Sequence, residues 1–200
     1  PRLPGDLVGT LGAEAWAEAR SGRLRSAAEL ADQALVLGTE YGRGARRAMI
    51  GARVTMALVH RERDELDTAL EVLAPHIEPA LREGHVAITT LGEVELARVE
   101  CARGRGDEAI VRLLRVRRDR AARGTPAFLT GVLDHAECRI RLHVGDVERA
   151  EDLLDEIEPG PERTLLQARA ALVSGRTEDV EPLVVDLRTS WPVDEETILA

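Results

Sequence analysis

The sequence predicts an all-α solenoid of about five stacked helical hairpins, and three observations lead to this prediction. First, one pattern recurs along the 200 residues: a polar turn, then a small or apolar residue five positions later, then an apolar helix. Second, the apolar residues in these helices follow the helical period of 3.6, and no segment shows the period of two expected of a strand. Third, a lone hairpin cannot bury its apolar stripe, so a row of hairpins implies a stack with a curved inner face.

The turns give this repeat its register. They begin at Gly22, Asp64, Gly104, Gly145 and, in a weaker copy, Gly175, at intervals of 42, 40, 41 and 30 residues. Glycine ends a first helix because it tolerates the left-handed conformation. An acidic residue beside the turn favours the positive N-terminus of the second helix. Five positions after each turn a small residue is expected where the two helices cross, and these residues are Ala27, Ala69, Ala109, Ala150 and, in the weak copy, Val180.

The expected helices follow in order from these turns. The first helices of the pairs are predicted at 6–21, 44–62, 86–103, 127–144 and 162–174. Each of the first four second helices carries an apolar stripe, which begins at Leu24, Leu66, Ala109 and Val147. Turn-rich segments separate the pairs at Gly38–Arg46, Arg82–His85, Ala122–Pro126 and Glu158–Pro161, and the last contains a Pro-Gly-Pro helix break.

Composition excludes several classes of protein. Hydrophobic residues make up 44% of the chain, which is too many for a disordered protein. The net charge of −9 makes nucleic-acid binding by this chain alone a poor interpretation, because phosphate contacts need a basic face. No apolar run approaches the roughly 20 residues that a membrane span needs. Without a secretory segment, the two cysteines do not indicate a disulfide framework, so a cytoplasmic location is expected.

The chain is expected to be one repeat domain, residues 1–200, cut from a longer protein. It shows no compositional boundary along its length. It ends at Thr197–Ala200, inside what looks like the start of another helix.

Two stretches carry a family resemblance: Leu96–Ala109 and Cys138–Leu154. Each stretch has the same order of residues: an arginine, a short apolar run, a glycine, an acidic residue and an alanine. A pair of leucines follows the alanine. The repeat of about 41 residues is longer than the 34-residue tetratricopeptide unit and lacks its Trp and Tyr positions. The chain resembles the tetratricopeptide-like helical region of MalT-like, LuxR-type bacterial transcription regulators.

The resemblance implies a non-catalytic module that senses a ligand or binds a protein partner. In such regulators the region lies between an ATP-binding switch module and a C-terminal helix-turn-helix, so DNA contact would belong to a domain absent from this chain. No Gly-x-x-x-x-Gly-Lys loop is present, since the chain has no Lys. The mechanism would be a shift in repeat packing that releases or restrains a neighbouring module. The alternative is a tetratricopeptide-like scaffold domain of a bacterial signalling kinase or cyclase that recruits a protein partner.

Residues for catalysis or metal binding are sparse. Five histidines and four serines give no nucleophile–base–orienter motif, so neither an enzyme nor a cofactor is expected. His135, Cys138 and His143 could suggest a metal site, but zinc usually needs a fourth ligand and none is evident. Cys138 is expected to be a core residue and the histidines to be surface residues. A redox pair of Cys101 and Cys138 is the weaker alternative to two reduced, buried thiols.

The candidate binding residues share one position in the repeat. Six residues before each turn stand Trp16, Leu58, Arg98, Arg139 and Arg169. If the hairpins stack like tetratricopeptide repeats, this position lies on the concave face and the arginines form a ladder suited to carboxylates or phosphates. The predicted partner is a protein or a small anionic ligand in this groove. The alternative is that each arginine pairs with a nearby acid, such as Glu95 for Arg98 or Asp134 for Arg139.

A second group of arginines is predicted to be a solvated helix face. Its members lie late in one second helix, where cations suit the negative end of the helix dipole. As a nucleic-acid patch the group is short and has no interleaved aromatic residue. The residues are Arg112, Arg115, Arg117, Arg118 and Arg120.

Overall fold

A computed structural model describes residues 4–122 and 126–190 of the chain, and all the regular secondary structure within them is helical. The chain divides into two compact units, unit 1 (Pro1–Arg103) and unit 2 (Gly104–Ala200), each of which is described by itself. The helix predicted to start near Thr197–Ala200 lies outside the described residues.

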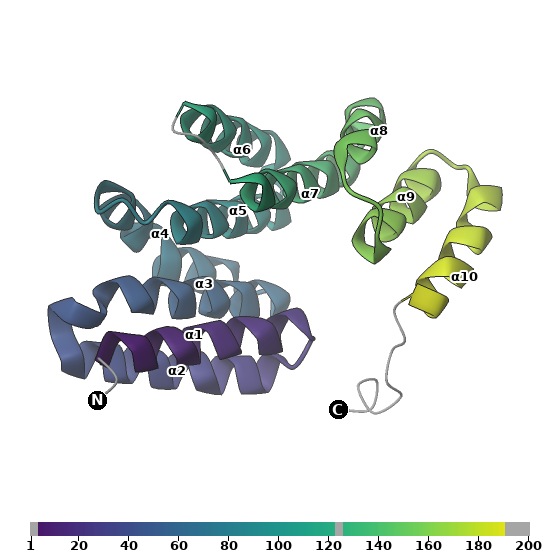
Figure 1. The fold of residues 1–200 in the computed structure, drawn as a ribbon. Helices are drawn as coiled ribbons and strands as arrows, with labels where there is room; N and C mark the ends of the chain where they lie inside the picture. The colour runs from purple at the N-terminus through teal and green to yellow at the C-terminus, as the bar shows by residue number, and fades with distance from the viewer. Residues whose placement is uncertain (1–3, 123–125, 191–200) are drawn as a thin grey trace. The chain divides into compact units, whose positions relative to one another are not determined.

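Unit 1 holds the first two hairpins and the first helix of the third. Helices α1 and α2 pack side by side, α3 packs on both, and α5 packs on α3 and α4 (Figure 1). The elements are α1 (Pro4–Arg20), α2 (Leu24–Tyr41), a 3-10 turn η1 (Gly42–Ala45), α3 (Arg46–Glu62), α4 (Leu66–Arg82) and α5 (Val86–Ala102).

Unit 2 continues the same alternation of helix and short turn. In it, α7 packs on α6, α8 and α9, and α10 packs on α9. The elements are α6 (Gly106–Ala121), α7 (Ala127–Val144), α8 (Val147–Glu156), α9 (Pro161–Val173), a 3-10 turn η2 (Thr177–Asp179) and α10 (Val180–Ser190). Together the two units confirm the predicted fold class, an all-α chain of helical-hairpin repeats.

The predicted turn register is confirmed. All five turn residues have positive φ, including Asp64 at 62°, the only non-glycine residue in this conformation within the described part of the chain. The four alanines that follow the turns by five positions are each 0% exposed, which agrees with their place at helix crossings. Val180 of the weak copy is only half-buried.

One predicted boundary is wrong. The segment from Gly38 was expected to be a turn, but α2 continues to Tyr41. Gly38 is buried within α2, and a Cβ there would collide with the side chain of Met49 in α3. This glycine therefore serves a close helix approach and not a turn.

Apolar side chains fill the interior of each unit. The largest cluster in unit 1 joins α3, α4 and α5 through residues such as Val54, Leu73 and Leu96. The cluster in unit 2 joins α7, α8 and α9 and includes Cys138 and Leu154. Among the described helices, none is long and apolar enough to cross a membrane.

Candidate functional site

Unit 1 contains an open groove of ≈ 1410 Å³. Its lining comes mainly from the three first helices α1, α3 and α5, with contributions from the end of α2 and the turn before α5. The lining residues are Gly5, Asp6, Gly9, Thr10, Gly12, Ala13, Trp16, Tyr41, Arg47, Ala48, Gly51, Val54, Gly84, His85, Val86, Ala87, Ile88 and Leu91.

Small residues form the part of the groove where α1 meets α3. A Cβ built on Gly12 would lie 3.3 Å from the backbone nitrogen of Ala52, so the two helices approach backbone to backbone. A Cβ on Gly9 would lie 3.9 Å from the Cβ of Ala48, an ordinary contact. Because no side chain projects from these glycines, the groove stays open where larger residues would fill it.

Aromatic and aliphatic side chains supply the rest of the apolar lining. Trp16 is half-buried and packs against two apolar clusters, one that contains Val54 and one that contains Leu58, and these contacts fix the indole at the groove. Tyr41 is 44% exposed at the end of α2. Few charged groups line the groove, and two of them, Asp6 and Arg47, are exposed. The arrangement suits apolar side chains of a partner, with polar contacts at the edge.

Of the predicted binding residues, Trp16 lines this groove and Leu58 does not. Leu58 is 6% exposed and packs with Ala19, Ala27 and Val59 in the core beneath α1 and α2.

The three arginines of the predicted ladder belong to different units. Arg98 lies on α5 in unit 1, where its Nη1 is 3.6 Å from Oε2 of the buried Glu95. This contact matches the alternative in which Arg98 pairs with an acid. Arg139 is exposed on α7 and Arg169 is half-buried on α9, both in unit 2. The positive charges of both arginines act to lower the pKa of the Cys138 thiol, so both lie near that residue within unit 2. Whether these arginines bind a ligand stays a prediction.

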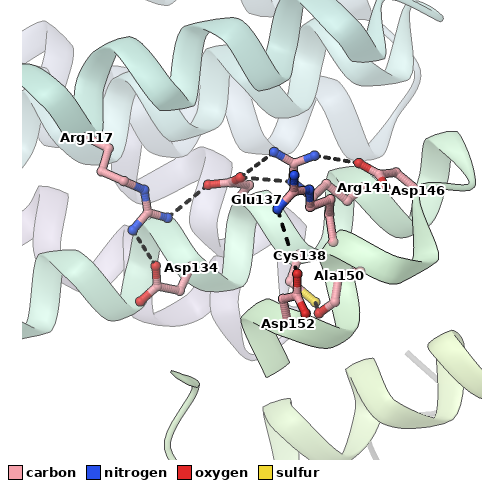
Figure 2. A network of polar contacts seen from close by, with 9 residues as sticks. Arg117, Asp134, Glu137, Cys138, Arg141, Asp146, Ala150 and Asp152 are labelled. Carbon is pink, nitrogen blue, oxygen red and sulfur yellow. Dashed lines mark hydrogen bonds and ion pairs between the residues drawn. The ribbon is translucent and has the colours of Figure 1, made fainter. Parts of the chain in front are cut away.

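Unit 2 contains a network of ion pairs that connects three helices (Figure 2). Glu137 of α7, whose side chain is 5% exposed, lies 2.9 Å from Arg117 of α6 and 2.8 Å from Arg141 one turn along α7. Arg117 also reaches Asp134 at 2.7 Å, and Arg141 reaches Asp146 at the start of α8 at 2.5 Å. Acidic neighbours raise the pKa of both arginines against the effect of burial. The network holds α6 and α8 to α7.

The network corrects the prediction of a solvated arginine face on α6. Arg115 and Arg118 are exposed as expected. Arg120, however, is only 3% exposed, and Arg117 bridges to the acids of α7. The prediction failed because sequence spacing along α6 does not show which acids α7 places opposite it.

The cysteines and histidines do not gather into a metal site. Within residues 4–122 and 126–190, no group of three or more His, Cys, Asp or Glu side chains could hold an ion. Cys138 is 0% exposed, as predicted for a core residue, and burial raises the pKa of its thiol to about 11. His143 is exposed, and Nδ1 of the half-buried His135 lies 2.8 Å from the Gly131 carbonyl. Cys101 is also a buried free thiol, in unit 1.

The repeat position six residues before the turn, which was predicted to bind, accounts for only Trp16 of the groove lining. The recurrent lining positions lie two and three helical turns earlier. Thirteen residues before the turn stand Gly9, Gly51 and Leu91, and sixteen before it stand Asp6, Ala48 and Ile88. The glycines on the α1 face were the available signal, since glycine inside a helix costs stability unless something must approach it closely.

Comparisons with known proteins agree with this fold. The sequence matches the family described as the MalT-like TPR region over residues 4–191. No curated protein matches the chain. Among solved structures, the chain is similar to the nearly identical TPR-like repeats of a Podosopora anserina protein assigned as a kinesin light chain. The TM-score is 0.61 and the sequence identity is 20%, and the match covers 94% of this chain and 96% of that chain. A single-substitution variant of the same protein gives the same values.

At that identity the structural likeness shows the fold alone, whereas the family match spans nearly all of the described helices. The chain therefore belongs to the family of MalT-like TPR regions.

Proposed function

We propose that this chain is the ligand-sensing or partner-binding module of a MalT-like, LuxR-type transcription regulator located in the cytoplasm. One observation carries the proposal: the open groove of unit 1, lined by three successive first helices and by Trp16. Membership of the MalT-like TPR region family supports the regulator context. DNA contact and catalysis would belong to other parts of the regulator.

The groove supports binding because its apolar lining is exposed to solvent in this chain. An occupant that covers Trp16 and Tyr41 would bury aromatic surface, which dominates the binding energy of many interfaces. Binding would also brace α1, α3 and α5 against one another, since each contributes to the lining. A change in the packing of these helices is the signal that a neighbouring module would receive.

A thermal-shift screen with sugars, nucleotides and acidic peptides tests the proposal. Ala13 is exposed and lines the groove, so Ala13→Arg would obstruct it at little cost to folding. We expect this variant to weaken any ligand found in the screen at least about tenfold. The control is Gln33→Arg, which adds the same charge at an exposed position of α2 that does not line the groove. A flat screen, or equal binding by both variants, would count against a small-molecule sensor in this groove.

Arg98 in unit 1 and Arg139 in unit 2 are two further candidates for contact with an anionic ligand. Replacement of either by alanine is expected to weaken binding of an acidic ligand while the helical circular dichroism stays unchanged. Loss of the helical signal in Arg98→Ala would favour a structural role, for which the Arg98–Glu95 contact is the present support.

The scaffold alternative, a domain of a signalling kinase or cyclase, is supported by the open groove lined by three first helices, which suits a segment of a protein partner. The gene itself separates the two proposals. A helix-turn-helix encoded beyond residue 200 supports the regulator, and a kinase or cyclase domain in the same protein supports the scaffold.

A further inference from the structure

Three basic residues lie where α3 packs on α4 in unit 1. Arg46 and Arg53 are seven residues apart on α3, about two helical turns, so they share one face. The guanidinium of Arg53 reaches across to α4, where its Nη1 donates a long hydrogen bond of 3.5 Å to the Val72 carbonyl. His76 stands one turn further along α4 and is half-buried. The three groups therefore lie around one seam between the helices.

Arg53 differs from three other partly buried arginines of the chain. Arg61, Arg117 and Arg141 each contact two carboxylates, which raise their pKa against the effect of burial. Burial lowers the pKa of Arg53, and among the described residues no acidic side chain raises that pKa again. Acids are not scarce, since the chain has 36 of them against 27 arginines.

His76 lies close enough to both arginines for their charges to act on it. Burial lowers the pKa of His76, and the positive charges of Arg53 and Arg46 lower it further. The seam thus brings three basic groups together in a protein whose net charge is −9. A partly desolvated cation with a single long hydrogen bond still has most of its five N–H donors available to a bound acceptor.

We propose that Arg46, Arg53 and His76 form an oxyanion site that binds a phosphate group, either as inorganic phosphate or as the phosphate of a small monoester. Two guanidinium forks match the oxygens of a phosphate bidentately, and a dianion satisfies two permanent positive charges better than a carboxylate does. The imidazole adds one donor while neutral. None of the three residues lines the groove, so this site goes beyond the proposed function.

Titration calorimetry on the whole chain tests the site with two probes, inorganic phosphate and glycerol 3-phosphate. Chloride replaces phosphate in the reference titration at the same ionic strength, so that screening effects cancel. We expect saturable binding of phosphate and none of chloride. Tighter binding of glycerol 3-phosphate would identify a monoester as the preferred ligand, and tighter binding of inorganic phosphate would identify the free ion.

Three variants show whether these residues form the site. Arg53→Gln is expected to weaken phosphate binding at least about tenfold, and Arg53→Lys to weaken it less, because charge is kept while the planar fork is lost. Arg46→Gln changes an exposed residue, so it tests the site even if a change at Arg53 disturbs folding. The matched control is Arg63→Gln, an exposed arginine that directly follows the end of α3.

Several results would overturn the proposal. Phosphate that binds no better than chloride excludes an oxyanion site. Full binding by folded Arg53→Gln places any bound phosphate elsewhere, and so does equal weakening by Arg46→Gln and Arg63→Gln. Loss of phosphate binding in Ala13→Arg, which obstructs the groove, would place the phosphate in the groove instead.

Discussion

Two helix contacts of the repeat, one in each unit, are made by different means. In unit 1, α1 and α3 approach closely because Gly9 and Gly12 face small residues, and the surface they leave is an open groove. In unit 2, α6, α7 and α8 are held together by carboxylates and guanidinium groups centred on Glu137. The α1–α3 contact thus depends on side-chain size, whereas the contacts among α6, α7 and α8 include a network of paired charges.

The difference shows what each unit can tolerate. A close contact between small residues fails when a side chain grows, whereas an ion-pair network fails when one partner is removed and its buried neighbours are left unpaired. Unit 1 is also the unit with the open, mainly apolar lining, so it is the better place for a partner.

The largest effect is expected at the centre of the charge network. Glu137→Ala removes the carboxylate that both Arg117 and Arg141 contact, and it leaves two partly buried cations without that partner. We expect a loss of about 3 kcal/mol in the free energy of unfolding of unit 2. Urea unfolding followed by circular dichroism at 222 nm measures it.

Glu148→Ala is the control for that measurement, since Glu148 is an exposed acid on α8. It is expected to change stability by less than about 0.5 kcal/mol. Equal effects of the two substitutions would mean that the network contributes nothing beyond an ordinary surface charge.

The next effect is expected where α1 crosses α3. Gly12→Val places a branched side chain where even a Cβ lies 3.3 Å from the backbone of Ala52. The helices must separate, and we expect a loss of about 2 kcal/mol from overpacking, measured as a lower midpoint of urea unfolding of unit 1. An unchanged midpoint would show that the close approach is not required.

Much of this fold was predictable from the sequence, because it depends on local signals. A turn residue with positive φ and an alanine five positions later define the first four hairpins, and even Asp64 adopts the conformation expected of glycine. The candidate sites depend on contacts between helices. Arg117 and Glu137 are 20 residues apart, and no periodicity along either helix indicates that their side chains meet. For the same reason, Leu58 shared a repeat position with Trp16 but lies in the core.

A smaller effect of opposite sign is expected at Gly51. A Cβ there would lie 3.8 Å from Cδ1 of Ile88, an ordinary van der Waals distance, so the site has room that Gly12 lacks. Gly51→Ala should therefore stabilise α3 by about 0.5–1 kcal/mol through helix propensity. A thermal melt that shows destabilisation would mean that α3 and α5 pack more tightly than this distance indicates.

The smallest effect is expected in the pH dependence of unit 1, and it comes from His76. Its pKa in the folded state lies below the ordinary value of 6.5, first because of burial and then because of Arg53 and Arg46. As pH falls below 6.5, the unfolded chain takes up this proton before the folded chain does, so stability is lost between 6.5 and the lower folded pKa. Urea midpoints at pH 7.5 and 5.5 should therefore differ less in His76→Gln than in the wild-type chain.

The exposed His143→Gln in unit 2 should leave that difference unchanged. Saturating phosphate should also reduce it if the anion binds beside His76, because a bound negative charge favours the protonated ring.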